Sequence, residues 1–62
     1  MMLVVCIPAF NEERKIGNVV KKALTCSDKV IVCDDGSSDN TADVAELAGA
    51  FVIKHKKNRG KG

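Results

Sequence analysis

The amino-acid sequence predicts an α/β fold in which three parallel strands alternate with two helices. Three short runs rich in β-branched apolar residues, at residues 3–7, 29–33 and 50–53, have the length and composition of strands in a parallel sheet. The two segments between these runs place apolar residues at helical spacing. A β-α-β-α-β order with short connections implies right-handed crossovers, so we expect one parallel sheet.

The first predicted strand covers residues 3–7 and is followed by Pro8. Its continuous apolar run, without polar alternation, indicates a strand buried on both faces of a sheet. Proline has no backbone N–H, so it suits the exit of a strand better than its interior. We therefore expect the chain to leave the sheet at Pro8.

The first helix is expected to begin at Asn11, because an Asn side chain is a good acceptor for the free N–H groups of a first helical turn. Glu12 and Glu13 would then lie in that turn, where the helix dipole favours negative charge. The helix should end near residues 25–27. Its apolar side chains at helical spacing are Ile16, Val19, Val20, Ala23 and Leu24.

The second strand is predicted at residues 29–33, and Asp39 or Asn40 is expected to cap the helix that follows. This helix should run to about residue 48, with Gly49 at the position where helices commonly end. Its predicted apolar side consists of Ala42, Val44, Ala45, Leu47 and Ala48. The third strand, residues 50–53, leads into a basic segment.

The length of 62 residues allows at most one small domain. A chain of this size buries only about 60% of the surface that its unfolded form exposes. Parallel β/α architectures usually contain more strands, so residues 1–62 are interpreted as a single partial domain. We expect it to depend on self-association or on a further C-terminal region.

Composition excludes some classes of site and location. The three cysteines show no C-x-x-C spacing and His55 is the single histidine, so a zinc site is not expected. Free thiols inside apolar runs are typical of a reduced, cytoplasmic setting. No run reaches the roughly 18 apolar residues of a membrane span, so any membrane association would come from regions outside this chain.

Two adjacent carboxylates, Asp34 and Asp35, directly follow the second predicted strand. In open α/β sheets, ligands bind in the crevice beyond the carboxyl ends of the strands. A carboxylate there can accept a hydrogen bond from a nucleobase N–H or coordinate a divalent metal ion. The alternative is a well-capped helix start without a ligand, because Gly36 and residues 37–41 are good turn formers.

Two further segments have a functional and a purely structural interpretation. Phe10 can line a base or ribose pocket, with Glu12 accepting from a sugar hydroxyl, or it can act as a hydrophobic staple on the first helix. Lys61, between two glycines, suits contact with phosphate oxygens. Its alternative is a solvated basic terminus. The residues alone leave both choices open.

Together, PAFNEE after the first strand, VIVCDDGSSDNT along and after the second, and NRGKG after the third resemble the family 2 glycosyltransferases of GT-A fold. The nearest resemblance is to dolichyl-phosphate mannose synthase-like enzymes, and it covers essentially the whole chain. It implies that the chain is the opening, nucleotide-sugar-binding portion of a Rossmann-like GT-A domain. The parent enzyme would transfer a sugar from a nucleoside-diphosphate donor to an acceptor such as polyprenyl or dolichyl phosphate, using Mg²⁺ or Mn²⁺.

The resemblance also implies a set of substrate-binding residues. Asp35 is expected to contact the base and Lys61 the diphosphate, while Phe10 stands where Tyr is common, so that ring packing is kept without a phenol hydroxyl. The D-x-D metal motif and the catalytic residues of such enzymes come after a later strand, so none is expected within residues 1–62. The full set of implied binding residues is Pro8, Ala9, Phe10, Glu12, Cys33, Asp34, Asp35 and Lys61.

The alternative function is a non-catalytic α/β module that binds a partner or a polyanion through the basic residues 54–61. Nucleic acid is not an expected partner. A sugar-1-phosphate nucleotidyltransferase is a second enzymatic alternative, but it would carry a Gly-rich loop after the first strand, and residues 8–13 are not Gly-rich.

Overall fold

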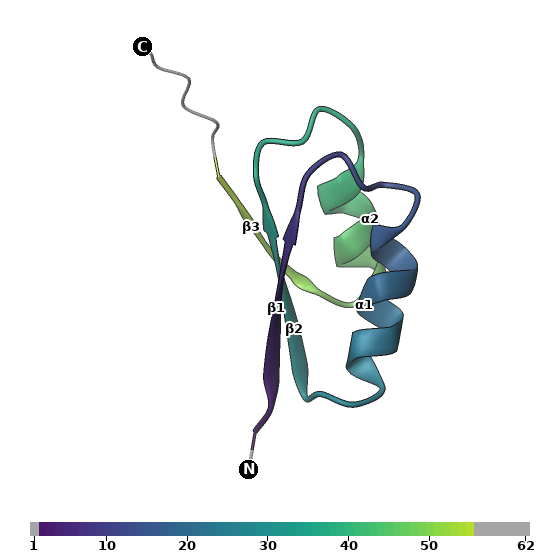
Figure 1. Cartoon of the computed structure of the whole chain (residues 1–62), viewed down its shortest axis with the longest axis vertical. Coiled ribbons are helices and arrows are strands. Elements are labelled where there is room, and N and C mark those ends of the chain that lie inside the picture. The colour runs from purple at the N-terminus through teal and green to yellow at the C-terminus, as the bar shows by residue number, and fades with distance from the viewer. Residues whose placement is uncertain (1, 56–62) are drawn as a thin grey trace.

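The computed structural model of the protein describes residues 2–55, which form one parallel sheet with two helices (Figure 1). The strands lie in the order β1-β2-β3, and both neighbouring pairs are parallel. The predicted α/β class and the alternation of strand and helix are therefore confirmed. The elements are β1 (Val4–Ala9), α1 (Ile16–Leu24), β2 (Lys29–Asp34), α2 (Thr41–Ala48) and β3 (Phe51–Lys54).

The hydrophobic core lies between the sheet and the helices, which both cover the same face of the sheet (Figure 1). Val30 and Val32 of the central strand are completely buried, as are Val20 of α1 and Ala45 of α2. Burying a valine side chain contributes about 1.5–3 kcal/mol. Side chains of the central strand and of the inward-facing side of each helix therefore hold the two layers together.

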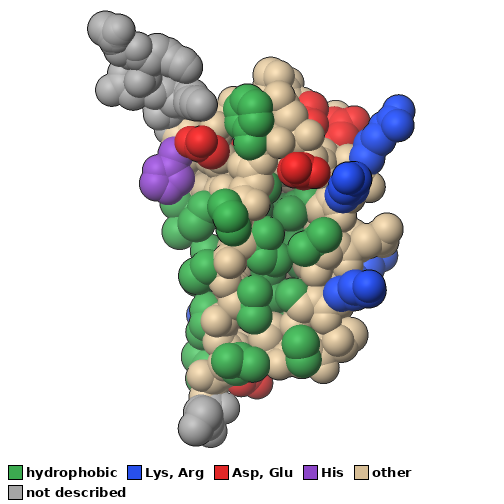
Figure 2. Space-filling model, in the orientation of Figure 1, with side chains coloured by type: hydrophobic (Ala, Val, Ile, Leu, Met, Phe, Trp, Pro, Cys, Tyr) green, Lys and Arg blue, Asp and Glu red, His purple; other side chains and the backbone are tan. Residues whose placement is uncertain are grey.

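The opposite face of the sheet carries apolar side chains that remain accessible, so the prediction of a first strand buried on both faces is wrong. Burial alternates along β1, with Val4 and Cys6 exposed and Val5 and Ile7 half-buried. In Figure 2, hydrophobic side chains run along the sheet side of the molecule, away from the helices. The apolar pattern requires a second covering layer, and residues 2–55 supply a layer on one face only.

The strand β1 continues through Pro8 to Ala9 rather than ending before the proline. Within the described part of the chain β1 is an edge strand that pairs with β2 alone. An edge strand has N–H groups that need no strand partner, so a proline is tolerated there.

The helix α1 begins at Ile16, so the prediction that Asn11 caps it is wrong. Asn11 has a positive φ of 50°, whereas a capping residue has an extended backbone. The residues predicted to form the first helical turn instead form a separate turn, in which the carbonyl of Glu12 accepts from the N–H groups of Lys15 and Ile16.

The helix α2 is capped by Asp39, whose Oδ1 accepts from the N–H of Thr41 at 3.0 Å, while Asn40 makes no such side-chain bond. Gly49 ends the helix with φ of 113°, as predicted. Leu47, predicted on the apolar side, is 88% exposed. Two residues along an α-helix correspond to a rotation of about 200°, so Leu47 lies on the opposite side of the helix from the buried Ala45.

Candidate functional site

The three strands end in a row at one edge of the sheet. Ala9, Asp34 and Lys54 are register partners, so the last residues of β1, β2 and β3 are neighbours. The backbone continues this row, since the N–H of Asp35 donates to the carbonyl of Ala9 at 2.9 Å and that of His55 to the carbonyl of Asp34 at 2.8 Å. The predicted parallel sheet therefore brings the loops after the strands to a common edge.

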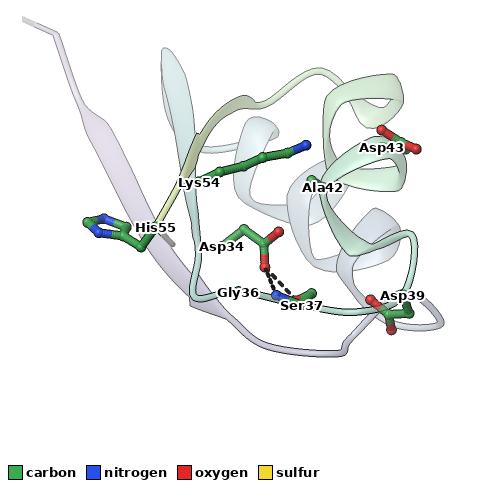
Figure 3. A pocket seen from close by; sticks show the side chains of 8 residues that line it. All are labelled: Asp34, Gly36, Ser37, Asp39, Ala42, Asp43, Lys54 and His55. Carbon is green, nitrogen blue, oxygen red and sulfur yellow. Dashed lines mark hydrogen bonds between the residues drawn. The ribbon is translucent and has the colours of Figure 1, made fainter. Parts of the chain in front are cut away.

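The two adjacent aspartates at this edge have different environments. Asp34 is 4% exposed, and its Oδ1 accepts hydrogen bonds from both the N–H and the hydroxyl of Ser37 (Figure 3). Asp35, the next residue, is exposed to solvent. The first carboxylate therefore shapes its own loop, whereas the second is accessible to a ligand.

The loop after β1 is hydrogen-bonded to the loop after β2 through Asn11. Its N–H donates to the hydroxyl of Ser37 at 2.8 Å, and its Oδ1 accepts from the N–H of Ser38 at 2.9 Å. Asn is one of the few residues that adopt a positive φ readily, and here that conformation accompanies both bonds. The residue expected to start a helix instead joins two loops.

The next two residues of the first loop are bound to the start of α2. The N–H of Glu12 donates to the hydroxyl of Thr41 at 2.8 Å, and that of Glu13 to Oδ2 of Asp39 at 3.3 Å. In return, the carboxylate of Glu13 accepts from the N–H of Asn40 at 2.8 Å. Three consecutive N–H groups of the first loop are thus paired with side chains 26 to 29 residues further along the chain.

The hydrogen bonds of Asp39 affect its pKa. The hydrogen bond from the hydroxyl of Thr41 lowers the pKa of Asp39 below its ordinary value, with partial desolvation acting against this and the N–H groups of Thr41 and Glu13 adding to it. Its carboxylate is therefore ionised at neutral pH and accepts hydrogen bonds through both oxygens.

A hollow of about 660 Å³ lies beside the row of strand ends, between β3 and the start of α2 (Figure 3). The side chain of Lys54 reaches across it from β3 towards α2 (Figure 3). Lys54 and His55 were predicted only as part of a basic segment. The parallel register that places Lys54 beside Asp34 could have indicated this position. The lining residues are Asp34, Gly36, Ser37, Asp39, Ala42, Asp43, Lys54 and His55.

The predicted binding residues lie at the same edge but on different sides of it. Pro8 and Cys33 are register partners whose side chains lie on the uncovered face, while Ala9 is buried on the helix side. Phe10 is 49% exposed, and Glu12 is also exposed. Of these residues and the two aspartates, the hollow includes Asp34 alone. Lys61 lies outside the described residues.

The described residues do not fit a metal ion. No three side chains among the His, Cys, Asp and Glu residues of positions 2–55 come together as ligands, and the adjacent aspartates acquire no third partner of that kind. The same residues contain no helix long and apolar enough to cross a membrane.

Comparison with known proteins identifies the family. The sequence pattern of the family described as Glycosyl transferase family 2 matches residues 4–62. The chain belongs to this family. The predicted membership of family 2 is therefore confirmed, and the fold is the opening β-α-β-α-β unit of a GT-A domain.

Individual relatives agree with this assignment. An uncharacterized protein of Methanocaldococcus jannaschii is 44% identical over 59 residues, covering 94% of this chain and 24% of the relative. The UDP-N-acetylglucosamine–dolichyl-phosphate N-acetylglucosaminyltransferase of Methanococcus voltae is 34% identical over 79 residues, covering 98% and 32%. The chain thus spans about a quarter to a third of these curated relatives.

A solved structure shows the same arrangement. Glucosyl-3-phosphoglycerate synthase from Mycobacterium tuberculosis, in complex with Mn²⁺, UDP-glucose and phosphoglyceric acid, superposes with a TM-score of 0.72 at 37% sequence identity. The match covers 86% of this chain and 20% of the synthase.

Proposed function

We propose that this chain is the donor-binding portion of a glycosyltransferase and that it binds the nucleoside part of a nucleoside-diphosphate sugar at the common edge of β1 and β2. The observation that carries the proposal is the hydrogen-bonded pair of loops at this edge, which brings residues 10–13 and 35–41 together. Ligands of open α/β sheets bind at such an edge.

Asp35 is the residue proposed to recognise the base. Asp34 is buried against Ser37, whereas Asp35 is exposed to solvent, so we assign the contact with a nucleobase N–H to Asp35. Phe10 contributes a half-exposed ring next to the same loop, and stacking of a base on an aromatic ring is worth about 1–3 kcal/mol. Glu12 is proposed to accept from a ribose hydroxyl.

The remaining binding residues form the surroundings of this contact. Pro8, Ala9 and Cys33 belong to the ends of β1 and β2 that support the two loops. Because β3 is parallel and ends at the same edge, a contact of the following basic segment with the donor's diphosphate is consistent with the topology. We assign that contact to Lys61.

The parent reaction is proposed to be sugar transfer to a phosphorylated acceptor. The relative from Methanococcus voltae is named for dolichyl phosphate, which supports a polyprenyl phosphate acceptor, and the synthase structure contains UDP-glucose, Mn²⁺ and phosphoglyceric acid. A mannose synthase-like specificity remains part of this proposal. The metal would neutralise charge on the leaving diphosphate, with ligands from outside the described residues. We place the protein in the cytoplasm, with any membrane association through other regions.

Nucleotide titration tests the donor site directly. We expect UDP or GDP with Mg²⁺ to bind the 62-residue chain weakly but saturably, without sugar transfer, because the chain spans only part of its relatives. Asp35→Asn should weaken binding by about 1–3 kcal/mol, since a charged acceptor for the base is lost. Asp43→Asn is the matched control, because it removes an exposed carboxylate of α2 that lines the neighbouring hollow.

Two results would reject the proposed function. Either neither nucleotide binds saturably, or Asp35→Asn and Asp43→Asn have equal effects. Equal affinity for unrelated polyanions, with a steep dependence on salt, would favour the non-catalytic module instead.

A further inference from the structure

We infer that Ser37 and Thr41 are positioning residues, whose hydroxyl groups hold the loop of residues 10–13 in the orientation that presents Phe10 and Glu12 to the nucleoside. This inference rests on the proposed donor-binding function. Neither hydroxyl is assigned a contact with the ligand itself. Their proposed role is to fix the backbone of the loop that provides such contacts.

The two hydroxyl groups make the same arrangement twice. Thr41 donates to Oδ1 of Asp39 and accepts from the N–H of Glu12 at 2.8 Å. Ser37 donates to Oδ1 of Asp34 and accepts from the N–H of Asn11, also at 2.8 Å. In each case a carboxylate, a hydroxyl and a backbone N–H form a short chain of hydrogen bonds that crosses from one loop to the other. We call these two chains the carboxylate–hydroxyl relays.

The chemistry of the groups fixes the direction of each relay. An ionised carboxylate can only accept, so the single hydrogen of the hydroxyl must point to it. The lone pairs of the hydroxyl oxygen then face the N–H of the first loop. Asp39 is held in its ionised form because the bond from Thr41 lowers its pKa. The carboxylates therefore orient the hydroxyl groups, and the hydroxyl groups orient the loop.

The loop needs these bonds because its own segment supplies few. The helix α1 begins only at Ile16, so the N–H groups of residues 11–13 have no helical partner. The second loop and the first residue of α2 provide acceptors for all three N–H groups, because Glu13 donates directly to Asp39 while the hydroxyl groups of Ser37 and Thr41 serve the other two. Phe10 precedes this bonded stretch immediately, so the relays hold the backbone next to the residue that carries the ring.

The hydroxyl of Thr41 can be separated from its role in packing. Thr41 is completely buried, but the N–H at the start of α2 is capped by Asp39 and not by the threonine hydroxyl. Thr41→Val keeps the buried shape and removes the hydroxyl, whereas Thr41→Ser keeps the hydroxyl and removes a buried methyl group. Comparing the two variants therefore separates the role of the hydroxyl in positioning the loop from the contribution of Thr41 to stability.

The experiment compares these variants by amide hydrogen exchange without ligand and by titration with UDP and Mg²⁺. We expect Thr41→Val to lower the denaturant midpoint, because the N–H of Glu12 and Oδ1 of Asp39 each lose a partner, to speed exchange at the amide of Glu12, and to weaken UDP binding about three- to tenfold. Thr41→Ser should lower the midpoint yet keep both the slow exchange at Glu12 and the UDP affinity within about twofold.

Two further variants test the second relay and guard against a failure of Thr41→Val to fold. Ser37→Ala should speed exchange at the amide of Asn11 while leaving that of Glu12 protected. Asp39→Asn keeps an oxygen that can accept from Thr41, but the NH₂ group that replaces the other oxygen cannot accept from the N–H of Glu13. Exchange should therefore speed at the amide of Glu13.

The outcomes distinguish this inference from the proposed function. If UDP affinity follows stability in both Thr41 variants, or if Thr41→Val leaves exchange at Glu12 unchanged, the positioning role is wrong. If the wild-type chain binds neither UDP nor GDP while Thr41→Val still frees the amide of Glu12, the donor-binding function is wrong and the loop-holding role of Thr41 stands.

Discussion

Replacing Asp34 tests whether the first of the paired aspartates has a structural task. Its carboxylate is 4% exposed and accepts two hydrogen bonds from Ser37. Asp34→Ala removes both acceptor interactions and leaves the N–H of Ser37 without its partner. Asp34→Asn keeps one oxygen in the same place, so the bonds persist but lose the contribution of the charge.

The magnitude follows from these contacts. Each hydrogen bond to a charged group contributes about 1.5–3 kcal/mol to stability. The free-energy cost of burying the carboxylate offsets part of the contribution of the two bonds, so we expect Asp34→Ala to destabilise the protein by about 2–3 kcal/mol. For Asp34→Asn we expect about 1 kcal/mol. Since a 62-residue domain has a total stability of about 3–9 kcal/mol, the alanine variant should lose a large fraction of it.

Urea unfolding followed by circular dichroism measures both free energies, with Asp43→Asn as an exposed-carboxylate control that should cost only about 0.3–1 kcal/mol, because Asp43 lies in the first turn of α2. An Asp34→Ala protein as stable as the wild type would refute the reasoning, because the two bonds to Ser37 would then contribute nothing.

The remaining predictions concern Asp39 and Gly49. Because the folded-state pKa of Asp39 lies below its unfolded value of about 3.9, its contribution to stability is complete above that pH and is lost as the pH falls through the folded pKa. Urea midpoints measured from pH 6 down to pH 2 should therefore fall more steeply for the wild type than for Asp39→Asn, and parallel curves would contradict the assignment. Gly49→Ala should destabilise by about 1–2 kcal/mol, because φ is 113° and the new Cβ would lie 3.0 Å from Cδ1 of Leu24. An unchanged thermal midpoint in that variant would exclude strain at this position.

The fold could be predicted because strand and helix patterns are local properties of the sequence. Three β-branched runs and two amphipathic segments determine a β-α-β-α-β order whose handedness permits a parallel sheet. The start of α1 could not be predicted in the same way. Asn11 has the residue type of a helix cap, but its partners, Ser37 and Ser38, are about 26 residues away in the sequence.

The different roles of the two aspartates could partly be predicted from the sequence. Asp34 continues the alternation of Val30 and Val32, so strand periodicity could have placed its side chain on the helix-covered face. The hydrogen bond between the first loop and Thr41 could not be predicted from the sequence, because buried threonines at a helix start usually bond within their own turn. Only the folded arrangement brings its hydroxyl to Glu12.

The central claim is that the two joined loops form one nucleoside-binding edge. The most direct measurement is a map of backbone amide chemical shifts of the 62-residue chain during titration with UDP and Mg²⁺. The account predicts saturable shifts concentrated in residues 10–13 and 35–38. Shifts confined to the hollow around Asp43 and Lys54, with the amides of the joined loops unchanged, would contradict it.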